Sequence, residues 1–153
     1  MSSLPSANAP QTGRCRCGRT SIAITAPPIM TAACHCRGCQ RMSASAFSLT
    51  ALVPVAAFAV TAGSPVRGGI KGPQLDHNFC PDCMSWMFTR IDGMDFVNVR
   101  PTMFDDPRWS IPFIETVTAE KLPWATTPAR HSYPGYPPPE DYGPLLAEFA
   151  AGL

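Results

Sequence analysis

Short runs in the middle of the chain alternate between apolar and polar residues. In one run Ile22 and Ile24 fall on the same face, and in another Phe47, Leu49 and Val53 do. Alternation with a period of two residues predicts β-strands with one buried face. The runs that we expect to be strands are Thr20–Ala26, Phe47–Val53, Ala57–Thr61, Leu75–Phe79, Trp86–Arg90, Phe96–Arg100 and Phe113–Thr118.

Turn residues separate these runs at Gly63-Ser64-Pro65, Gly68-Gly69, Gly72-Pro73 and Asp92-Gly93. Short strands between such turns predict a mainly β fold of antiparallel strands. Two segments are predicted to be helical instead. Arg37–Ser43 can form a single helical turn, and Asp141–Ala151 can form a short closing helix with Leu145, Leu146 and Phe149 as its apolar face.

The 153 residues divide by composition into three parts. Residues 1–13 are rich in Ser, Pro, Ala and Gln and are predicted to be a disordered leader. Residues 14–125 form the predicted domain. A chain of 153 residues can bury about 70% of its unfolded surface, so a core is available. Residues 126–153 begin with a proline-rich stretch, which predicts an extended C-terminal arm that packs on the domain or on a partner.

Charge is unevenly distributed although the formal net charge is only +1. Residues 1–75 carry seven basic and no acidic residues, and residues 76–153 carry five basic and eleven acidic residues. The basic half could attract anions, or it could partly offset the negative charge of metal-bound thiolates. The arginines are scattered without interleaved aromatic residues, which argues against nucleic-acid binding.

The chain has no segment that resembles a membrane span. Its longest apolar run, Ala51–Val60, contains Pro54 and is about ten residues long, whereas a span needs about 20. The first twenty residues also lack the pattern of a signal peptide. We therefore expect a cytoplasmic protein, in which thiols stay reduced and clustered cysteines indicate metal or redox chemistry.

Seven cysteines provide the main candidate chemistry, and they fall into three groups. The groups are Cys15-Arg16-Cys17, Cys34-His35-Cys36-Arg37-Gly38-Cys39 and Cys80-Pro81-Asp82-Cys83. Pairing Cys15 and Cys17 with Cys80 and Cys83 would make a closed site of four thiolates, as in structural zinc sites. Such a site typically contributes on the order of 10–16 kcal/mol of apparent binding energy to folding.

This pairing leaves Cys34, Cys36 and Cys39 as three ligands within six residues. Three protein ligands with an open fourth position are typical of catalytic zinc, and neighbouring thiolates favour a soft fourth ligand such as a substrate thiol. Three alternatives remain open. The three cysteines could share an ion with a cysteine of another group, they could be reduced and metal-free, or they could form a redox switch that releases metal.

Histidines are weaker candidates for ligands. His35 lies between two cysteines, but on an extended segment its side chain points away from both neighbours. We therefore expect it to pack beside the site and support it. His77 and His131 are expected to be surface or hydrogen-bonded residues.

The order of the cysteine groups resembles the glutathione-dependent formaldehyde-activating family over roughly residues 13–125. The matching segments are Cys15-Arg16-Cys17-Gly18, Cys34-His35-Cys36-Arg37-Gly38-Cys39, Ser45-Ala46-Phe47, Phe79-Cys80-Pro81-Asp82-Cys83 and Leu122-Pro123-Trp124. The resemblance implies a β-tent fold of several coiled antiparallel sheets around a structural zinc. It also implies two zinc ions per chain, a structural one on Cys15, Cys17, Cys80 and Cys83 and a catalytic one on Cys34, Cys36 and Cys39.

The family reaction implied by this resemblance joins formaldehyde and glutathione to form S-hydroxymethylglutathione. It is classed as a carbon–sulfur lyase reaction running in reverse. The sequence departs from the family pattern at Met84 and Ala44, where glycine is usual, and at Gln40-Arg41, where a basic pair is commoner. We expect the two glycine losses to alter a tight turn beside the structural site and the wall of the pocket.

The functional hypothesis is that a substrate thiol takes the open position beside Cys34, Cys36 and Cys39 and attacks formaldehyde or another small electrophile. Glutathione carries two carboxylates, for which the candidate partners are Arg37, Arg41, Arg90 and Arg100. The alternative is a non-enzymatic zinc-bound binding or chaperone-like module, since a fold does not determine a function. The proline-rich arm and low charge would suit a homodimer.

Overall fold

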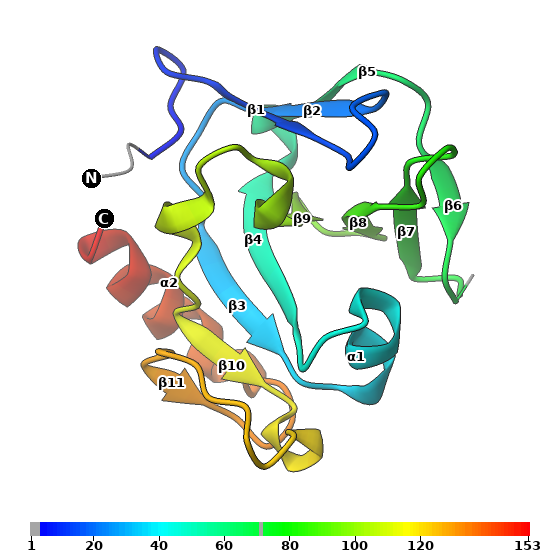
Figure 1. Ribbon diagram of the computed structural model, residues 1–153. Coiled ribbons are helices and arrows are strands. Elements are labelled where there is room, and N and C mark those ends of the chain that lie inside the picture. The colour runs from blue at the N-terminus through cyan, green and yellow to red at the C-terminus, as the bar shows by residue number, and fades with distance from the viewer. Residues whose placement is uncertain (1–3, 71) are drawn as a thin grey trace. The chain divides into compact units, whose positions relative to one another are not determined.

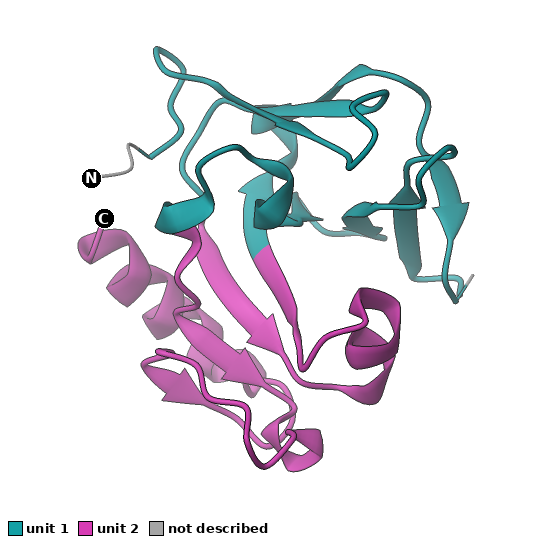
Figure 2. Ribbon diagram, in the orientation of Figure 1, with its two compact units in different colours: residues 1–28, 51–109 teal, residues 29–50, 110–153 magenta. Residues whose placement is uncertain are grey.

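The computed structural model describes residues 4–70 and 72–153, and its helices and strands are labelled in Figure 1. Lys71 and the first three residues of the predicted leader lie outside the described residues. The fold is mainly β, as predicted, with short helices and a C-terminal helix. The chain divides into two compact units, coloured separately in Figure 2. Unit 1 comprises the chain up to Pro28 and Ala51–Trp109, and unit 2 comprises Ile29–Thr50 and Ser110–Leu153.

Unit 1 contains two sets of antiparallel strands. One set has the order β1-β2-β5, from β1 (Gln11–Arg14), β2 (Ser21–Ile24) and β5 (Phe58–Ala62). The other has the order β4-β9-β8-β7-β6, from β4 (Ser48–Pro54), β9 (Phe96–Val99), β8 (Trp86–Ile91), β7 (Leu75–Phe79) and β6 (Val66–Gly68). Only the second half of β4, from Ala51 onward, belongs to unit 1, and its first residues belong to unit 2. Six of these eight strands fall in runs that the sequence predicted to be strands, whereas β1 and β6 do not.

Apolar side chains from both sets form the core of unit 1. Ile22 and Ile24 are fully buried, which confirms the predicted inward face of β2. The rings of Phe58 and Phe88 lie 4.8 Å apart between centroids. Each large aliphatic or aromatic side chain buried in this way stabilises the fold by about 1.5–3 kcal/mol. The alternation that predicted the strands is therefore the same pattern that builds the core.

The prediction of which side chains of β4 are buried is wrong in part. We expected Leu49 to lie inward with Val53, but Leu49 is half-buried, whereas Thr50, Ala51 and Val53 are buried. Thr50 and Ala51 are consecutive, and consecutive residues of a strand point to opposite faces. Both faces of β4 are therefore covered at this point, and a rule based on one buried face does not describe such a strand.

Unit 2 is built around parallel strands, which corrects the expectation of antiparallel pairing throughout. Its order is β11-β10-β3, from β11 (His131–Ser132), β10 (Ile114–Thr116) and β3 (Met30–Cys34). Parallel neighbours need a long crossover connection, and here most of unit 1 lies between β3 and β10 in the chain. These strands are only two to five residues long and are joined by a long connection. The local pattern of residues therefore does not indicate that they pair.

Helix α1 (Arg37–Ser43) has the bounds that the sequence predicted. Its N-cap is Cys36, whose sulfur accepts a hydrogen bond from the Cys39 backbone N–H at 3.2 Å. The Glu120 carboxylate accepts another from the Arg37 N–H at 2.6 Å, so the helix start is held from two sides. The helix ends at Ala44 in the left-handed conformation.

Helix α2 (Tyr142–Ala151) begins one residue after the predicted start. Leu145 is buried on its inner face, and the Phe149 ring packs against Phe113 with centroids 5.4 Å apart. Short 3₁₀ turns lie at Val55–Ala57, Pro101–Met103, Pro107–Ser110, Thr118–Glu120 and Pro139–Asp141. None of the helices in the described residues has the length and hydrophobicity that a membrane span requires.

The last residues of the predicted leader are structured. Ser6 and Ala9 form a short bridge, and strand β1 begins at Gln11, three residues before the predicted start of the domain. Gly13 explains why β1 was not predicted. A Cβ at this position would lie 3.2 Å from Ile22, so close packing favours glycine, which adds nothing to an alternation of apolar and polar residues.

The two positions at which the family pattern usually has glycine adopt a left-handed backbone conformation here, although neither of them is glycine. Ala44 has φ 49° at the end of α1, and Met84 has φ 57° after the last cysteine. The two turns therefore keep this conformation with other residues, at a cost of roughly 1 kcal/mol each, because Cβ crowds the neighbouring carbonyl oxygen.

Replacing Ala44 by glycine should therefore raise the free energy of unfolding by about 1 kcal/mol. The matched control is Ala56→Gly, also an exposed alanine, in the 3₁₀ turn Val55–Ala57, which should lower it by roughly 0.5–1 kcal/mol. Denaturant unfolding of the three proteins measures both changes. Equal destabilisation by the two substitutions would show that Ala44 is not strained.

Candidate metal centres

Four cysteine sulfurs of unit 1 form one compact cluster. The sulfurs of Cys15, Cys17, Cys80 and Cys83 all lie within 4.8 Å of one another. The sulfurs of Cys15 and Cys17 are 3.5 Å apart, and those of Cys17 and Cys80 are 3.8 Å apart. Tetrahedral zinc with Zn–S bonds of about 2.3 Å places its sulfurs about 3.8 Å from one another. The cluster predicted from the sequence is thus brought together at spacings that fit such an ion.

Two tight turns create this cluster. Cys15 follows β1, and Gly18 closes the first turn at φ 78° with its N–H donating to the Cys15 carbonyl at 3.0 Å. Cys80 follows β7, and the Met84 N–H donates to the Cys80 carbonyl at 3.0 Å in the second turn. Each CxC or CxxC pair therefore projects from a strand end through a bend that brings its sulfurs together.

The chemistry of the four sulfurs also suits a cation. Burial by itself raises the pKa of Cys83, but hydrogen bonds from Ser85 outweigh it and lower that pKa to about 5. Cys15 and Cys80 are buried, so thiolates there need a positive charge nearby. An ion pair between Arg19 and Asp82 joins the two turns at 2.9 Å, but both side chains are well exposed and the pair stabilises little.

The other three cysteines form a second cluster, in unit 2. The sulfurs of Cys34, Cys36 and Cys39 lie within 4.8 Å of one another, and no fourth His, Cys, Asp or Glu of the described residues joins them. Cys34 ends β3, while Cys36 and Cys39 lie at the start of α1, which follows β3 in Figure 1. All three are half-buried. The second cluster therefore offers three ligands of one kind to a metal ion.

One proton is easily lost from this cluster. A hydrogen bond with Cys39 lowers the pKa of Cys34 to about 5, against the opposing effect of burial. The same bond, together with burial, raises the pKa of Cys39. The Cys34 sulfur is therefore ionised at neutral pH before any metal is added, and a soft cation such as zinc fits a donor set of three sulfurs.

His35 points away from both neighbouring cysteines, as predicted for a residue between two ligands on an extended segment. Its side chain is completely buried, and its Nε2 is 2.9 Å from the carboxylate of Glu115. Its ring packs edge-on against Phe47, with centroids 5.4 Å apart. The residue between two ligands thus anchors their loop to the interior of unit 2.

Glu115 is the residue that sequence reasoning missed. It is only 6% exposed, and it accepts hydrogen bonds from Lys121, Thr127 and Ser132 as well as from His35. Burial by itself raises its pKa, but these four bonds lower it to about 2. The available signal was one acidic residue inside the otherwise uncharged run Phe113–Thr118.

The arginines named as candidate partners for a substrate are divided between the units. Arg37 and Arg41 lie on α1 with exposed side chains, in the same unit as the three-cysteine cluster. Arg90 and Arg100 belong to unit 1. Arg90 lies over the rings of Phe58 and Phe88, and Arg100 is buried 3.9 Å from the ring of Trp86.

The other two histidines make hydrogen bonds elsewhere. His77 Nδ1 is 2.8 Å from the hydroxyl of Thr89, and His131 Nε2 is 2.9 Å from the carboxylate of Glu148. Both interactions agree with the expectation that these residues are hydrogen-bonded. Neither histidine is part of the two cysteine clusters.

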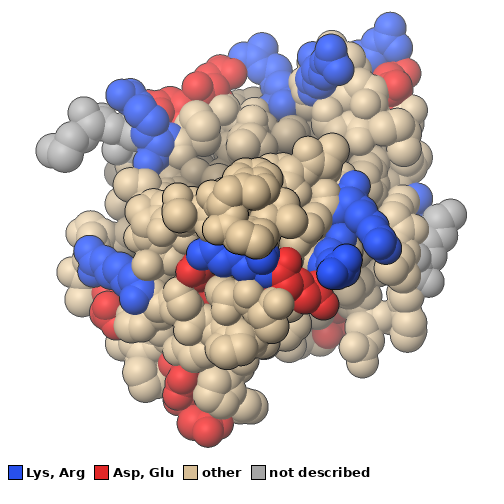
Figure 3. Space-filling view, turned by 60° about the horizontal axis from the view of Figure 1, so that its bottom comes forward, with Lys and Arg blue, Asp and Glu red and all other residues tan. Residues whose placement is uncertain are grey.

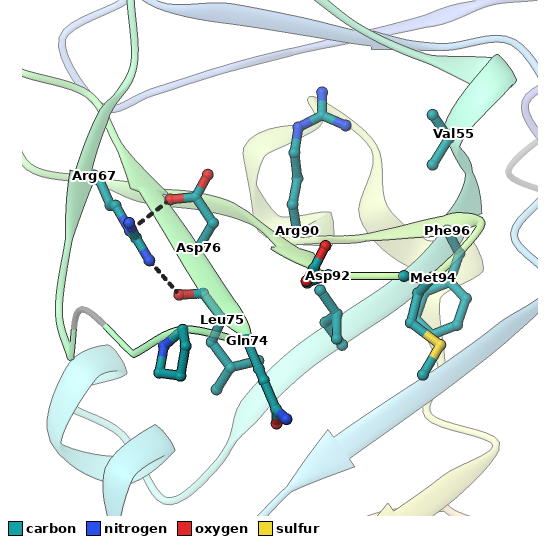
Figure 4. Close-up of a pocket in the computed structure, with 12 residues that line it drawn as sticks. Val55, Arg67, Gln74, Leu75, Asp76, Arg90, Asp92, Met94 and Phe96 are labelled. Carbon is teal, nitrogen blue, oxygen red and sulfur yellow. Dashed lines mark hydrogen bonds and ion pairs between the residues drawn. The ribbon is translucent and has the colours of Figure 1, made fainter.

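A separate cavity of about 450 Å³ lies in unit 1, and Figure 4 shows its lining. Its most prominent charged pair is Arg67 and Asp76, 3.0 Å apart, and Arg67 also donates to the Gly72 and Leu75 carbonyls. Arg90 stands away from this pair in Figure 4. No cysteine lines the cavity, so it is distinct from both clusters.

The uneven charge of the sequence does not form a continuous basic surface on the face shown in Figure 3. Lys and Arg side chains there are scattered among Asp and Glu side chains. Tight binding to nucleic acid relies on many clustered cations that contact phosphates. This face offers no such cluster.

Comparison with known proteins places the chain in a family. The family model for the glutathione-dependent formaldehyde-activating enzyme matches residues 10–120, a segment that contains all seven cysteines. The chain belongs to the glutathione-dependent formaldehyde-activating family. This result confirms the resemblance carried by the three cysteine groups.

Three relatives from this family illustrate the extent of the match. A Penicillium rubens protein is 31% identical over 108 residues, or 65% of this chain and 56% of the relative. An Emericella nidulans protein is 29% identical over 93 residues, or 56% and 47% of the two chains. An Aspergillus terreus protein is 29% identical over 107 residues, or 64% and 55%. All three are provisionally named glutathione-dependent formaldehyde-activating enzymes, and the chain spans about half the length of these curated relatives.

A solved structure of a Rhodobacter sphaeroides protein has a similar fold. It matches 63% of this chain and 92% of that chain, with a TM-score of 0.52. The two chains are 18% identical, so the likeness shows the fold alone. The family match and the fold thus rest on separate comparisons.

The hydrogen bonds of Glu115 should make stability depend on acid pH. Because its pKa is about 2 in the folded state and 4.5 ordinarily, its contribution is complete above pH 4.5 and is lost as pH falls toward 2. The stability difference between wild type and Glu115→Gln should narrow by about 3 kcal/mol over that interval. Denaturant unfolding at several pH values measures it.

Glu148→Gln is the matched control, because it removes a carboxylate of the same unit that is 46% exposed. Its stability difference from wild type should change much less with pH. If the free energies of unfolding of wild type and Glu115→Gln changed equally with pH, the lowered pKa of Glu115 in the folded protein would be contradicted.

Proposed function

We propose that this protein is a zinc-dependent carbon–sulfur lyase that acts in the synthetic direction and adds a thiol to formaldehyde or another small electrophile. Glutathione is the thiol suggested by the family and by the names of its relatives. The observation that carries the proposal is the three-cysteine cluster of unit 2, which no fourth His, Cys, Asp or Glu of the described residues joins and which shares no cysteine with the cluster of unit 1. Three ligands leave room for a substrate, whereas four close a site.

In this proposal the two clusters have different tasks. Cys15, Cys17, Cys80 and Cys83 hold a structural zinc that ties the two turns of unit 1 together. Cys34, Cys36 and Cys39 would hold a catalytic zinc, which would lower the pKa of a substrate thiol bound beside them. A reducing compartment such as the cytoplasm would keep these thiols available for metal.

The reaction forms one C–S bond. The sulfur of the substrate attacks the carbonyl carbon of formaldehyde, the C=O π electrons move to oxygen, and the proton released by the thiol ends on that oxygen. All atoms of thiol and aldehyde are retained in the hydroxymethyl thioether. No oxidant, reductant or further cofactor is required.

The protein's own residues position the substrate. The exposed cations Arg37 and Arg41 lie on the helix that carries Cys39, where they can attract the carboxylates of glutathione. His35 and Glu115 hold the loop of Cys34 and Cys36 against the interior, so the sulfurs keep their spacing during binding. Preorganisation of this kind favours catalysis because little reordering is needed when the substrate arrives.

Zinc stoichiometry tests the two-site arrangement. Wild-type protein should bind two zinc ions per chain, and Cys36→Ser should bind one with the fold retained, because only the three-cysteine site loses a ligand. Cys80→Ser should also lose one zinc, and it should unfold at markedly lower temperature, because the metal that links β1 to β7 is lost. Metal analysis combined with thermal unfolding measures both. Simultaneous loss of both ions from Cys36→Ser would contradict independent sites.

Turnover tests the substrate. Zinc-loaded protein should consume formaldehyde and glutathione faster than a protein-free control, and Cys36→Ser should not, because its catalytic site has lost a ligand. S-Methylglutathione, which lacks a free thiol, should give no reaction with wild type. If zinc-loaded wild type causes no acceleration, the proposal fails for this substrate pair and a non-enzymatic binding module becomes the better interpretation.

A further inference from the structure

The C-terminal arm supplies side chains to the interior of unit 2. The Ser132 hydroxyl donates to Oε1 of the buried Glu115 at 2.6 Å, and the Thr127 hydroxyl donates to Oε2 at 2.9 Å. Lys121, which precedes the arm, contacts the same two oxygens at 3.1 and 2.9 Å. Two of the groups that hold this carboxylate therefore come from the arm, beyond the segment 10–120 that the family model matches.

Strand pairing places Ser132 beside Glu115. The two residues are partners in the register of β10 and β11, and the Tyr133 N–H donates to the Glu115 carbonyl at 3.0 Å. Figure 1 shows β10 between β11 of the arm and β3, which ends at Cys34. The arm is thus one neighbour of β10, and the strand that leads into the three-cysteine cluster is the other.

The carboxylate of Glu115 connects the arm to the cysteine segment, residues 34–39. Its Oε2, which accepts from Thr127, is also 2.9 Å from Nε2 of the completely buried His35. The His35 N–H donates to the Thr116 carbonyl at 3.0 Å. The residue between the first two cysteines of the segment is therefore held by its backbone and by its side chain. The side-chain contact depends on a carboxylate that the arm orients.

The two hydroxyls give this carboxylate its orientation. Without Ser132, the remaining donor to Oε1 is Lys121, whose side chain is 24% exposed. A lysine ammonium is a point charge on a flexible stem, so it attracts a carboxylate without fixing its direction. A hydroxyl on a short side chain offers one directed proton, and its strand fixes where that proton points. Loss of a hydroxyl should therefore loosen the contact that Glu115 makes with His35.

We propose that Ser132 and Thr127 are positioning residues for the metal ion of the three-cysteine site. They act through Glu115 and His35, which keep the cysteine segment at its ligand spacing. The inference rests on the zinc site of the proposed function and makes the arm a working part of that site.

The test is competition for zinc between the zinc-loaded full-length chain and chelators of graded affinity. The step that is absent from Cys36→Ser identifies the ion of the three-cysteine site. Outer partners that orient metal ligands typically change metal affinity by about 10–100-fold, and these hydroxyls lie one contact further out, so Ser132→Ala and Thr127→Val should each weaken binding at that step by roughly 10-fold. Affinity at the four-cysteine site should not change.

Two further variants of the arm separate this role from a general loss of stability. Tyr133→Phe is the matched control, because the hydroxyl that it removes donates to Asp141 at 3.1 Å and not to Glu115. It should leave both zinc affinities unchanged. Thr127→Ser keeps the donated proton and should bind zinc as wild type does.

Each result decides a different point. Wild-type affinity at the three-cysteine site in Ser132→Ala and Thr127→Val overturns the inference and leaves the proposed function intact. Equal losses at both sites, or an equal loss in Tyr133→Phe, also overturn it, because the arm would then act through stability alone. Weak binding by Thr127→Ser overturns the role of that hydroxyl. Wild type that binds a single zinc ion overturns the inference together with the proposed function.

Discussion

The gathering of sulfur atoms is the constraint on which the rest of this structure depends. Seven thiols are drawn into two groups, each with sulfurs within 4.8 Å, and two of the seven are buried. Thiols packed this closely lose protons readily at some positions, as the pKa of about 5 at Cys34 and at Cys83 indicates. Negative charge so concentrated is unfavourable without a cation, because burial removes the water that would otherwise solvate it. Metal binding is the simplest way to stabilise both groups at once.

The two groups differ in how the chain supports them. In unit 1 the sulfurs come from two turns that follow strands, so the geometry is local to each turn and only their meeting is long-range. In unit 2 the three sulfurs belong to one short segment, and the support comes from elsewhere. His35 anchors that segment to Glu115, and Glu115 in turn receives Lys121 and two hydroxyls from the residues that follow. Contacts of this kind hold the ligands of a metal site at their spacing.

Strain is concentrated near the same features. Among the described residues other than glycine, three adopt positive φ, namely Ala44, Met84 and Val117. Ala44 ends the helix that carries Cys39, Met84 follows Cys83, and Val117 follows the strand that pairs with Cys34. Each therefore bends the chain within a few residues of a cysteine or of its strand partner. The cost of roughly 1 kcal/mol at such a position is small beside the stabilisation that a zinc site supplies.

The sequence by itself determined the features that depend on near neighbours. The spacing of cysteines identified both clusters, alternation located most strands of unit 1, and α1 was placed at its observed bounds. Tertiary structure alone decided the parallel pairing of β10 with β3 and β11, the burial of both faces of β4 and the meeting of Glu115 with His35. The physical reason is distance along the chain: periodicity and ligand spacing act within a few residues, whereas His35 and Glu115 are separated by 80 residues whose path no local pattern encodes.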